Sequence, residues 1–320
     1  MTENSSVFGL RRQARCLTAV TNSTEQSKFL AGTVGAKDNV VCLLEFDDDV
    51  GSIKPTMYSH PEEVWDITSC PTNEDLFFTC HSPDNKSDQH CALNPIHLGP
   101  LEQNQHVTLL TIDVSPTWTN SFAIQQLQNA VWNPHQPEII TVGGQNLSGW
   151  DLRSAKSSFH HPEAHKTTIR AVDYNPNKPH CIATGGDDAM VSIWDTRQLK
   201  NQVMQIERHT HWVWSVAFNH LQDQLLLTSG SDALVQLHNI FSASSAAYLN
   251  DNEEENESIE GSEVNKPMDG LVRTYDQHED SVYQVAWSPA DIWTFASISY
   301  AGRVVISQVP QDEKFKILGV

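Results

Sequence analysis

EAHKTTIRAVDYNPNKPHCIATGGDDAMVSIWDTR, residues 163–197, contains the pattern that decides the fold. In this segment, Ile169 lies four residues after His165, and Val172 lies seven residues after it. The same spacing of a histidine and two aliphatic residues recurs after His60, His209 and His278. Because 44 residues separate His165 from His209, the chain contains a structural repeat, which has to be interpreted before any single motif.

Each repeat continues as short apolar runs separated by turn residues, such as CIATGG followed by DDAM and then VSIW. Runs of about four to eight residues with turn signals at intervals of about ten residues predict successive antiparallel strands. About four strands in each repeat are typical of a β-propeller blade. The predicted fold is therefore an all-β propeller, in which no long segment has a helical period.

One set of polar side chains recurs at fixed offsets from the repeat histidine. We expect His165, Thr184, Asp188 and Trp194 to be buried and linked by hydrogen bonds, because each buried group left unpaired costs about 1–3 kcal/mol. The next repeat has the equivalent residues His209, Thr228 and Asp232, with His238 in place of the tryptophan. These residues are predicted to stabilise the blades and to have no catalytic role.

The segments IWDTR (193–197) and GWDLR (149–153) are similar to the ends of WD repeats. The chain resembles the family of WD-repeat proteins that interact with the endosome-associated recycling protein complex, EARP, and with its Golgi-associated counterpart, GARP. The resemblance extends from FGLRRQAR (8–15) through residues 209–237 to YDQHEDSVYQVAWSP (275–289). It leaves out residues 98–121 and an acidic insert.

Six repeats are recognisable, whereas the resemblance implies a seven-bladed family pattern. We therefore predict a WD-repeat propeller of six blades, with a distorted or open seven-bladed ring as the alternative. The absent repeat would lie between the second and third, where residues 98–121 hold one clear strand, HVTLLTIDV, and are too short for a blade. Asp188 and Asp232 lie in a tight turn of their repeats, and we call this position the turn aspartate. The third and last repeats have Gly144 and Ala301 at this position.

The predicted domain organisation has three parts. Residues 1–240 form blades one to five, residues 241–269 form an acidic disordered loop, and residues 270–320 form the last blade and close the ring. The loop is predicted from the seven acidic residues and few apolar ones in its middle, because such a composition does not offset the entropy of ordering. The ring closes either through the tail FKILGV (315–320) alone or through that tail paired with SVFGL (6–10).

The overall charge argues for protein partners. A formal charge of −20 and a pI near 5.0 repel phosphate backbones and anionic lipids, so we expect neither nucleic-acid binding nor direct membrane insertion. The six cysteines form no CxxC pair, and no apolar run has the length of a signal peptide or a membrane span. We expect a cytoplasmic protein with reduced thiols, which reaches membranes only through its partners.

No enzymatic or metal-binding motif is present. The sequence lacks GxSxG, P-loop, GxGxxG and HExxH patterns, so we expect no enzymatic activity and no cofactor. Zinc binding requires three or four ligands that converge on the metal. The candidate histidines lie before the inner strand of a blade, after it, and two strands later, so we do not expect them to converge. These candidates are His209, His211, His220 and His238.

In propellers of the family type that the chain resembles, the residues three and five after the repeat histidine, and the one before the turn aspartate, lie on one rim. These positions include Glu63, Thr168, Asp187, Ser231 and Ser281 and the candidate partner-binding residues Trp65, Arg170, Trp212, Trp214, Tyr283 and Tyr300. Tryptophan, tyrosine and arginine dominate protein interfaces. The alternative is that Trp212 and Trp214 fill space between blades.

The resemblance implies a monomeric propeller that scaffolds the EARP and GARP complexes at endosomes and the trans-Golgi network. Its expected roles are endosomal recycling, retrograde trafficking to the trans-Golgi network and sorting of dense-core vesicle cargo. A second hypothesis rests on the WDxR motifs that end in Arg153 and Arg197, which resemble those of cullin-RING ubiquitin ligase receptors. The alternative explanation is that these arginines hydrogen-bond within turns at the ends of blades.

Overall fold

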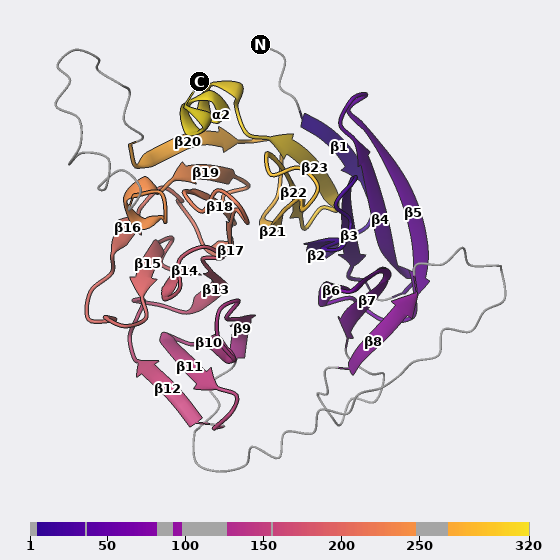
Figure 1. The fold of residues 1–320 in the computed structure, drawn as a ribbon. Helices are drawn as coiled ribbons and strands as arrows, with labels where there is room; N and C mark the ends of the chain where they lie inside the picture. Colours follow the sequence, from indigo (N-terminus) through magenta and orange to yellow (C-terminus); the bar gives the residue numbers. More distant parts are fainter. Residues whose placement is uncertain are drawn as a thin grey trace. The chain divides into compact units, whose positions relative to one another are not determined.

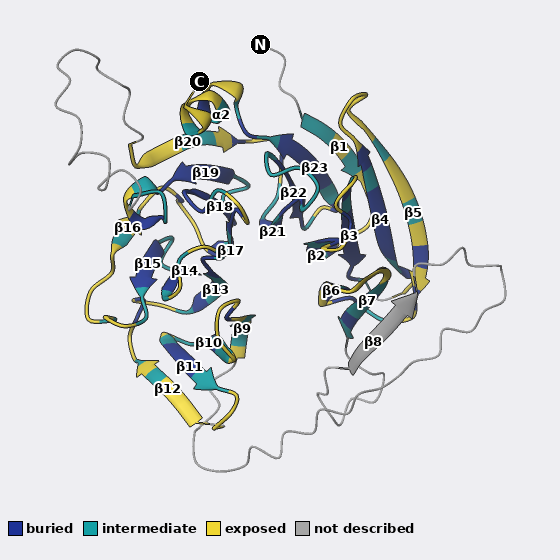
Figure 2. Ribbon diagram, in the orientation of Figure 1, coloured by how far each residue is buried: buried dark blue, intermediate teal, exposed yellow. Residues whose placement is uncertain are grey.

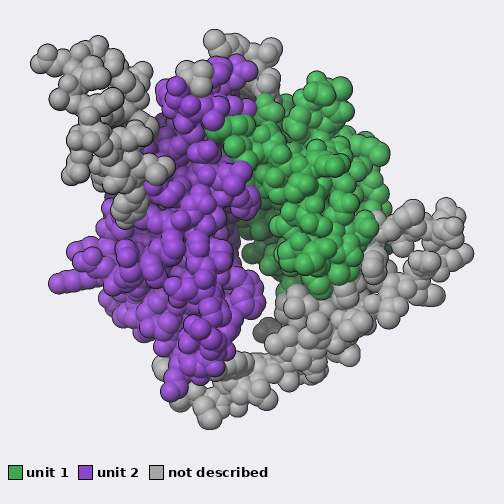
Figure 3. All heavy atoms as spheres, viewed as in Figure 1, with its two compact units in different colours: residues 1–122, 278–308 green, residues 123–277, 309–320 purple. Residues whose placement is uncertain are grey.

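The structure is a computed structural model that describes residues 5–35, 37–81, 92–97, 127–154, 156–247 and 268–319. Within these ranges the strands form five four-stranded sheets and one three-stranded sheet, and every pair is antiparallel (Figure 1). The chain divides into two compact units (Figure 3). Unit 1 comprises residues 1–122 and 278–308, and unit 2 comprises residues 123–277 and 309–320.

Unit 1 contains three of these sheets. The first consists of β2 (Ala14–Ala19), β3 (Ser27–Thr33), β4 (Asn39–Asp47) and β5 (Ser52–His60). The second consists of β6 (Asp66–Cys70), β7 (Asn73–His81) and β8 (Ala92–His97). The third contains, in order, β1 (Ser5–Gly9), β23 (Arg303–Gln308), β22 (Thr294–Ser299) and β21 (Val282–Trp287). Its pairing of β1 with β23 joins strands from near the two ends of the sequence.

Unit 2 contains the other three sheets. The first consists of β9 (Leu127–Trp132), β10 (Glu138–Gly143), β11 (Asn146–Asp151) and β12 (Lys156–His161). The second consists of β13 (Ile169–Tyr174), β14 (Cys181–Gly186), β15 (Val191–Asp195) and β16 (Met204–Ile206). The third consists of β17 (Val213–Phe218), β18 (Leu225–Gly230), β19 (Val235–Asn239) and β20 (Gly270–Tyr275). A 3₁₀ turn, η1 (Phe241–Ala243), follows β19, and helix α2 (Gln311–Leu318) ends the chain.

Burial follows the position of a strand in its sheet (Figure 2). All six residues of β14, of β18 and of β22 are buried, which explains why these strands read as continuous apolar or small-residue runs. The outer strands β5 and β12 are mostly exposed and polar. Gly185 of β14 has no room for a side chain, because an added Cβ would lie 2.6 Å from Val213 of β17. Neighbouring sheets of unit 2 therefore pack closely.

The expected closure of the last sheet through the C-terminal tail is wrong. Phe315 and Leu318 belong to helix α2, which begins with Asp312 and Glu313 in its first turn and ends at Gly319 in the left-handed conformation. The fourth strand of the last sheet is β1 alone, with Ser5 opposite Ser307 and Gly9 opposite Arg303. In the described ranges, no helix is long and apolar enough to cross a membrane.

Two of the predicted segments lie outside the described residues. One is the strand HVTLLTIDV within residues 98–121, and the other is most of the acidic loop, residues 248–267. At the base of that loop, the backbone N–H of Ser242 donates to the Asp269 carboxylate at 2.8 Å. The expectation that all thiols are reduced is wrong for Cys80, which is disulfide-bonded. Four other cysteines are free: Cys16, Cys42, Cys70 and Cys181.

Candidate functional site: two arginine–aromatic clusters

The repeat residues of the sheet β13–β16 meet in one hydrogen-bond network. His165 Nδ1 lies 3.0 Å from an Asp188 carboxylate oxygen, and its Nε2 lies 2.7 Å from the Thr184 hydroxyl. The indole N–H of Trp194 donates to the same hydroxyl at 2.8 Å. The pKa of Asp188 is lowered: burial alone would raise it, but the hydrogen bond and electrostatic interaction with His165, together with the backbone N–H groups of Met190 and Lys166, outweigh that effect. The four side chains therefore tie the first three strands together.

The sheet β17–β20 repeats this arrangement. His209 Nδ1 lies 2.9 Å from an Asp232 oxygen, and its Nε2 lies 2.8 Å from the Thr228 hydroxyl. His238 takes the place of the tryptophan, with Nε2 at 3.2 Å from the same hydroxyl. His209 and His238 are thus engaged with Thr228. Among the described residues, no group of three or more His, Cys, Asp or Glu could hold a metal ion.

The network is incomplete in the last sheet. His278 Nε2 lies 2.8 Å from the Ser297 hydroxyl, but Ala301 stands at the position of the turn aspartate. His278 Nδ1 consequently has no hydrogen-bond partner among the described residues, although the side chain is buried. The sheet β9–β12 has Gly144 in that turn, and among its described residues the network keeps only the bond from Trp150 Nε1 to the Thr141 hydroxyl, at 2.9 Å.

The strands at one edge of the sheets share a β-bulge. In β13, Ile169 pairs with Gly186 and Ala171 pairs with Gly185, so the ladder skips Arg170. A bulge of this kind reorients the skipped side chain, and bulges are frequent beside functional sites. The same irregularity occurs in β2, β9, β17 and β21, where the skipped residues are Arg15, Gln128, Trp214 and Tyr283.

In unit 2 the bulges bring together what we call the Arg170 cluster: Gln128, Arg170, Asp187, Trp212 and Trp214. Two nitrogens of the Arg170 guanidinium donate to the two Asp187 oxygens, each at 2.7 Å. The guanidinium carbon lies 4.9 Å from the Trp214 ring centroid and 5.4 Å from that of Trp212. A third nitrogen donates to Gln128 at 3.4 Å. The arginine is thus fixed by a bidentate ion pair and two cation–π contacts.

The two tryptophans of this cluster are also fixed. Their ring centroids lie 5.9 Å apart at an interplanar angle of 75°, an edge-to-face contact. The indole N–H of Trp214 donates to the Ser231 hydroxyl at 2.6 Å, and Trp214 is half-buried. Trp212 remains 40% exposed. The pair therefore combines packing within unit 2 with an exposed aromatic surface.

In unit 1 a second group, the Arg15 cluster, comprises Arg15, Trp65, Tyr283 and Tyr300. The guanidinium carbon of Arg15 lies 5.1 Å from the Trp65 centroid and 5.0 Å from the Tyr283 centroid. The Tyr283 and Tyr300 rings lie 5.8 Å apart. Trp65 is 41% exposed. An arginine again lies between aromatic rings, one of which is open to solvent.

Arg15 and Gln128 were missed by the repeat-histidine rule. The first repeat has Leu10 five residues before Arg15, and the third has Ala123 five residues before Gln128, where the other repeats have a histidine. An alignment of the strand sequences would have predicted the role of Arg15. When ARCLTA (14–19) is aligned with IRAVDY (169–174), Arg15 occupies the position of Arg170.

The WDxR arginines form local contacts. Arg197 Nε and Nη2 donate to the Asp195 carboxylate at 3.0 and 2.6 Å, and the backbone N–H of Arg197 donates to it at 2.9 Å. Arg153 Nε lies 3.7 Å from Asp151. The side chains of Arg153 and Arg197 remain 76% and 62% exposed. The aspartates therefore stabilise the turns, and both guanidinium groups stay on the surface.

Comparison with known proteins agrees with this architecture. The family model described as "EIPR1 beta-propeller" matches residues 2–115 and 101–238, and a "WD domain, G-beta repeat" model matches residues 270–306. An "EARP-interacting protein homolog" of Danio rerio is 34% identical, over 98% of both chains. "EARP and GARP complex-interacting protein 1" of Homo sapiens is 32% identical, also over 98% of both.

A relative from Dictyostelium discoideum, also named "EARP-interacting protein homolog", is 35% identical over 97% of this chain and 96% of its own. Two independent features therefore agree: recurrent sheets with histidine-centred hydrogen bonds, and similarity along almost the whole sequence. The chain belongs to the EIPR1 β-propeller family of WD-repeat proteins.

Proposed function

We propose that this chain is a non-enzymatic scaffold that binds subunits of the EARP tethering complex and of GARP. The relatives are named for their interaction with these complexes, and they match nearly the full length of the chain. Through these partners it would support endosomal recycling, retrograde trafficking to the trans-Golgi network and dense-core vesicle cargo sorting. It would act as a monomer in the cytoplasm and reach those membranes only through its partners.

We assign partner binding to the Arg15 and Arg170 clusters. The main support is the bidentate Arg170–Asp187 pair, which holds the arginine beside the exposed Trp212 ring. Fixed aromatic and arginine side chains lose little conformational entropy when a partner covers them, and they contribute most of the energy in many interfaces. Each cluster would accept a helical or extended segment of a tether subunit.

Affinity purification of the tagged full-length chain, with quantitative mass spectrometry, tests this proposal. The wild type should recover tether subunits. The double variant Trp212→Ala with Tyr283→Ala should recover at least about tenfold less, since truncating hot-spot residues often costs 2 kcal/mol or more. Trp132→Ala is a matched control, because Trp132 is 66% exposed and lies in neither cluster.

Two results would oppose the proposal in different ways. A folded double variant that retains wild-type amounts of tether subunits would show that the clusters are the wrong surface. A wild-type chain that recovers no tether subunit would contradict the function itself. The single variants Trp65→Ala and Trp212→Ala then report whether each cluster contributes on its own.

The ubiquitin-ligase hypothesis keeps one supporting observation, the exposure of the Arg153 and Arg197 side chains. The same purification tests it, because ligase adaptors and tether subunits are different proteins. If the chain is a ligase receptor, Arg197→Glu should remove the adaptor and leave tether subunits in place. Recovery of tether subunits without any adaptor would favour the scaffold function.

A further inference from the structure

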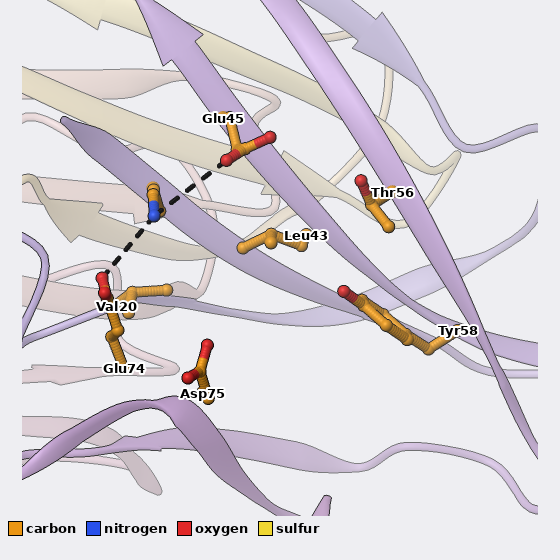
Figure 4. A pocket seen from close by; sticks show the side chains of 8 residues that line it. Val20, Leu43, Glu45, Thr56, Tyr58, Glu74 and Asp75 are labelled. Atoms are coloured by element: carbon orange, nitrogen blue, oxygen red, sulfur yellow. Dashed lines mark ion pairs between the residues drawn. The ribbon is translucent and has the colours of Figure 1, made fainter. Parts of the chain in front are cut away.

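A cavity of about 220 Å³ lies within unit 1 (Figure 4), and none of its lining residues belongs to the Arg15 cluster. Strands β3, β4, β5 and β7 contribute its lining. Val20 and Leu43 are the aliphatic residues of the lining, and the other lining residues carry polar or charged groups. The cavity is smaller than most sites for drug-sized ligands, which occupy about 300–1,000 Å³. Its size suits one side chain or a small fragment.

The lining has an excess of negative charge. The lining has three carboxylates, from Glu45, Glu74 and Asp75, and one ammonium group, from Lys28. Lys54, which lies outside the lining, also pairs with Glu45, at 3.2 Å. Lys28 Nζ lies 4.0 Å from Glu45 and 3.6 Å from Glu74. The Asp75 carboxylate forms no ion pair or hydrogen bond with any other described side chain. The cavity therefore favours a cation over a neutral or anionic ligand.

Tyr58 is an independent sign of a ligand. The residue is 8% exposed, and its hydroxyl points into the cavity (Figure 4). It has no hydrogen-bond partner within the part of unit 1 that the structure describes. Burial raises the pKa of Tyr58, and the nearby Glu45 and Asp75 raise it further, so the phenol stays protonated at neutral pH. The hydroxyl oxygen can accept a hydrogen bond from a ligand N–H placed in the cavity.

The shape of the site selects among cations. Among the described residues the carboxylates do not form a group that could hold a metal ion, so the negative charge is spread along the cavity wall. A guanidinium group is planar and presents several N–H donors in a fixed fork, which suits carboxylates and a hydroxyl at separate places. Its methylene stem would pack on Val20 and Leu43.

We propose that this cavity binds an arginine side chain presented by a partner protein. The guanidinium group contacts Asp75 and Glu74 and donates a hydrogen bond to the Tyr58 hydroxyl. The methylene groups of the arginine pack on Val20 and Leu43. The cavity is a second contact point, and its assignment does not depend on the partner-binding role of the Arg15 or Arg170 cluster. Its failure in the test below would leave that role untouched.

Methyl NMR of the full-length chain tests the proposal with N-acetyl-L-arginine amide as the probe. The methyl resonances of Val20 and Leu43 should shift and saturate with a Kd of about 1 mM, as expected for a single side chain. N-acetyl-L-citrulline amide has nearly the same shape without the charge and should bind at least about tenfold more weakly. Methyl resonances of unit 2, such as those of Leu226, should not move.

Two variants locate the binding to the cavity. Asp75→Asn and Tyr58→Phe should each weaken arginine binding about threefold or more, and Glu25→Gln, an exposed acidic residue outside the lining, should not. Spectra of unit 1 methyls outside the cavity lining verify that the variants fold. Equal binding of citrulline and arginine, no shift of the Val20 and Leu43 methyls, or unchanged affinity in both variants would each overturn the proposal.

Discussion

His238 Nε2 lies 3.2 Å from the Thr228 hydroxyl, where the preceding sheet has the indole N–H of Trp194. The hydroxyl therefore lies between two imidazoles. In the neutral tautomer of His209 that donates its Nδ1–H to Asp232, the Nε2 atom accepts the Thr228 proton. His238 must then donate its own Nε2–H. The neutral Nε2–H tautomer of His238 thus reproduces the tryptophan N–H bond in a smaller ring.

The first prediction concerns acid stability. Burial lowers the pKa of His238 to about 3 from an ordinary value of 6.5. The unfolded chain therefore binds the proton more readily than the folded chain. The free energy of unfolding should fall by about 1.4 kcal/mol for each pH unit between pH 6.5 and the folded-state pKa. His238→Gln keeps an N–H donor without titrating. Urea unfolding at pH 7 and pH 5 should show a smaller difference in the variant.

The second prediction completes the deficient network. In the turns that contain Asp188 and Asp232, the next residues, Ala189 and Ala233, have φ angles of 62° and 63°. In the last repeat Gly302, the residue after Ala301, has a similar φ angle of 78°. The backbone is thus already in the required conformation. Ala301→Asp should give His278 Nδ1 an acceptor and raise the free energy of unfolding by about 1–2 kcal/mol.

Thermal unfolding and titration of His278 measure this effect. Burial now lowers the pKa of His278 to about 4, and a carboxylate in contact with it should raise that pKa. Ala290→Asp, in the loop between β21 and β22 and outside the network, controls for added charge. An Ala301→Asp variant no more stable than the wild type, with an unshifted pKa, would show that the turn cannot hold the network.

The third prediction tests the complete network. The Thr184 hydroxyl has two side-chain partners, His165 Nε2 at 2.7 Å and Trp194 Nε1 at 2.8 Å, and it also lies 3.4 Å from the backbone carbonyl oxygen of Ser192. Thr184→Val is nearly isosteric and leaves both nitrogens unpaired, so it should cost about 2–4 kcal/mol. Thr167→Val, at an exposed position of the same repeat, should cost less than about 0.5 kcal/mol. Chemical unfolding distinguishes these values, and equal stabilities would contradict the role of the hydroxyl.

These networks could be predicted from the sequence because their members occur at fixed offsets. Thr184 and Asp188 lie 19 and 23 residues after His165, and Ala301 lies 23 residues after His278. The position of Arg15 follows from strand register, which the histidine offsets do not reveal in the first repeat. Closure by β1 depends on pairing between residues about 300 positions apart, which no local pattern encodes.

The number of blades stays a prediction. The alignment with the Danio rerio relative spans 384 positions, whereas this chain has 320 residues, so the alignment includes gaps in this chain. The described residues contain sheets for six repeats. The segment between the second and third repeats, where we expect a blade to be absent, lies outside the described residues. Sequence periodicity identifies each repeat but does not determine how many close a ring.

The fourth prediction concerns how the Arg170 cluster is held in place. Asp187 fixes the Arg170 guanidinium through two bonds of 2.7 Å, and Trp212 and Trp214 lie against that guanidinium. Asp187→Asn keeps the shape but removes the counter-charge, so the arginine should become mobile and binding of tether subunits should weaken about threefold to tenfold. Asp195→Asn, which loses the bidentate pair to Arg197, is a matched control outside both clusters.

Two measurements on the same proteins separate positioning from folding. Thermal unfolding should change little in either variant, because both ion pairs are partly exposed. Tryptophan fluorescence should change only in Asp187→Asn, because the guanidinium contacts both indole rings of the cluster. If Asp187→Asn binds tether subunits as well as Asp195→Asn does, a fixed Arg170 is unnecessary. Partner binding would then depend on the tryptophans alone.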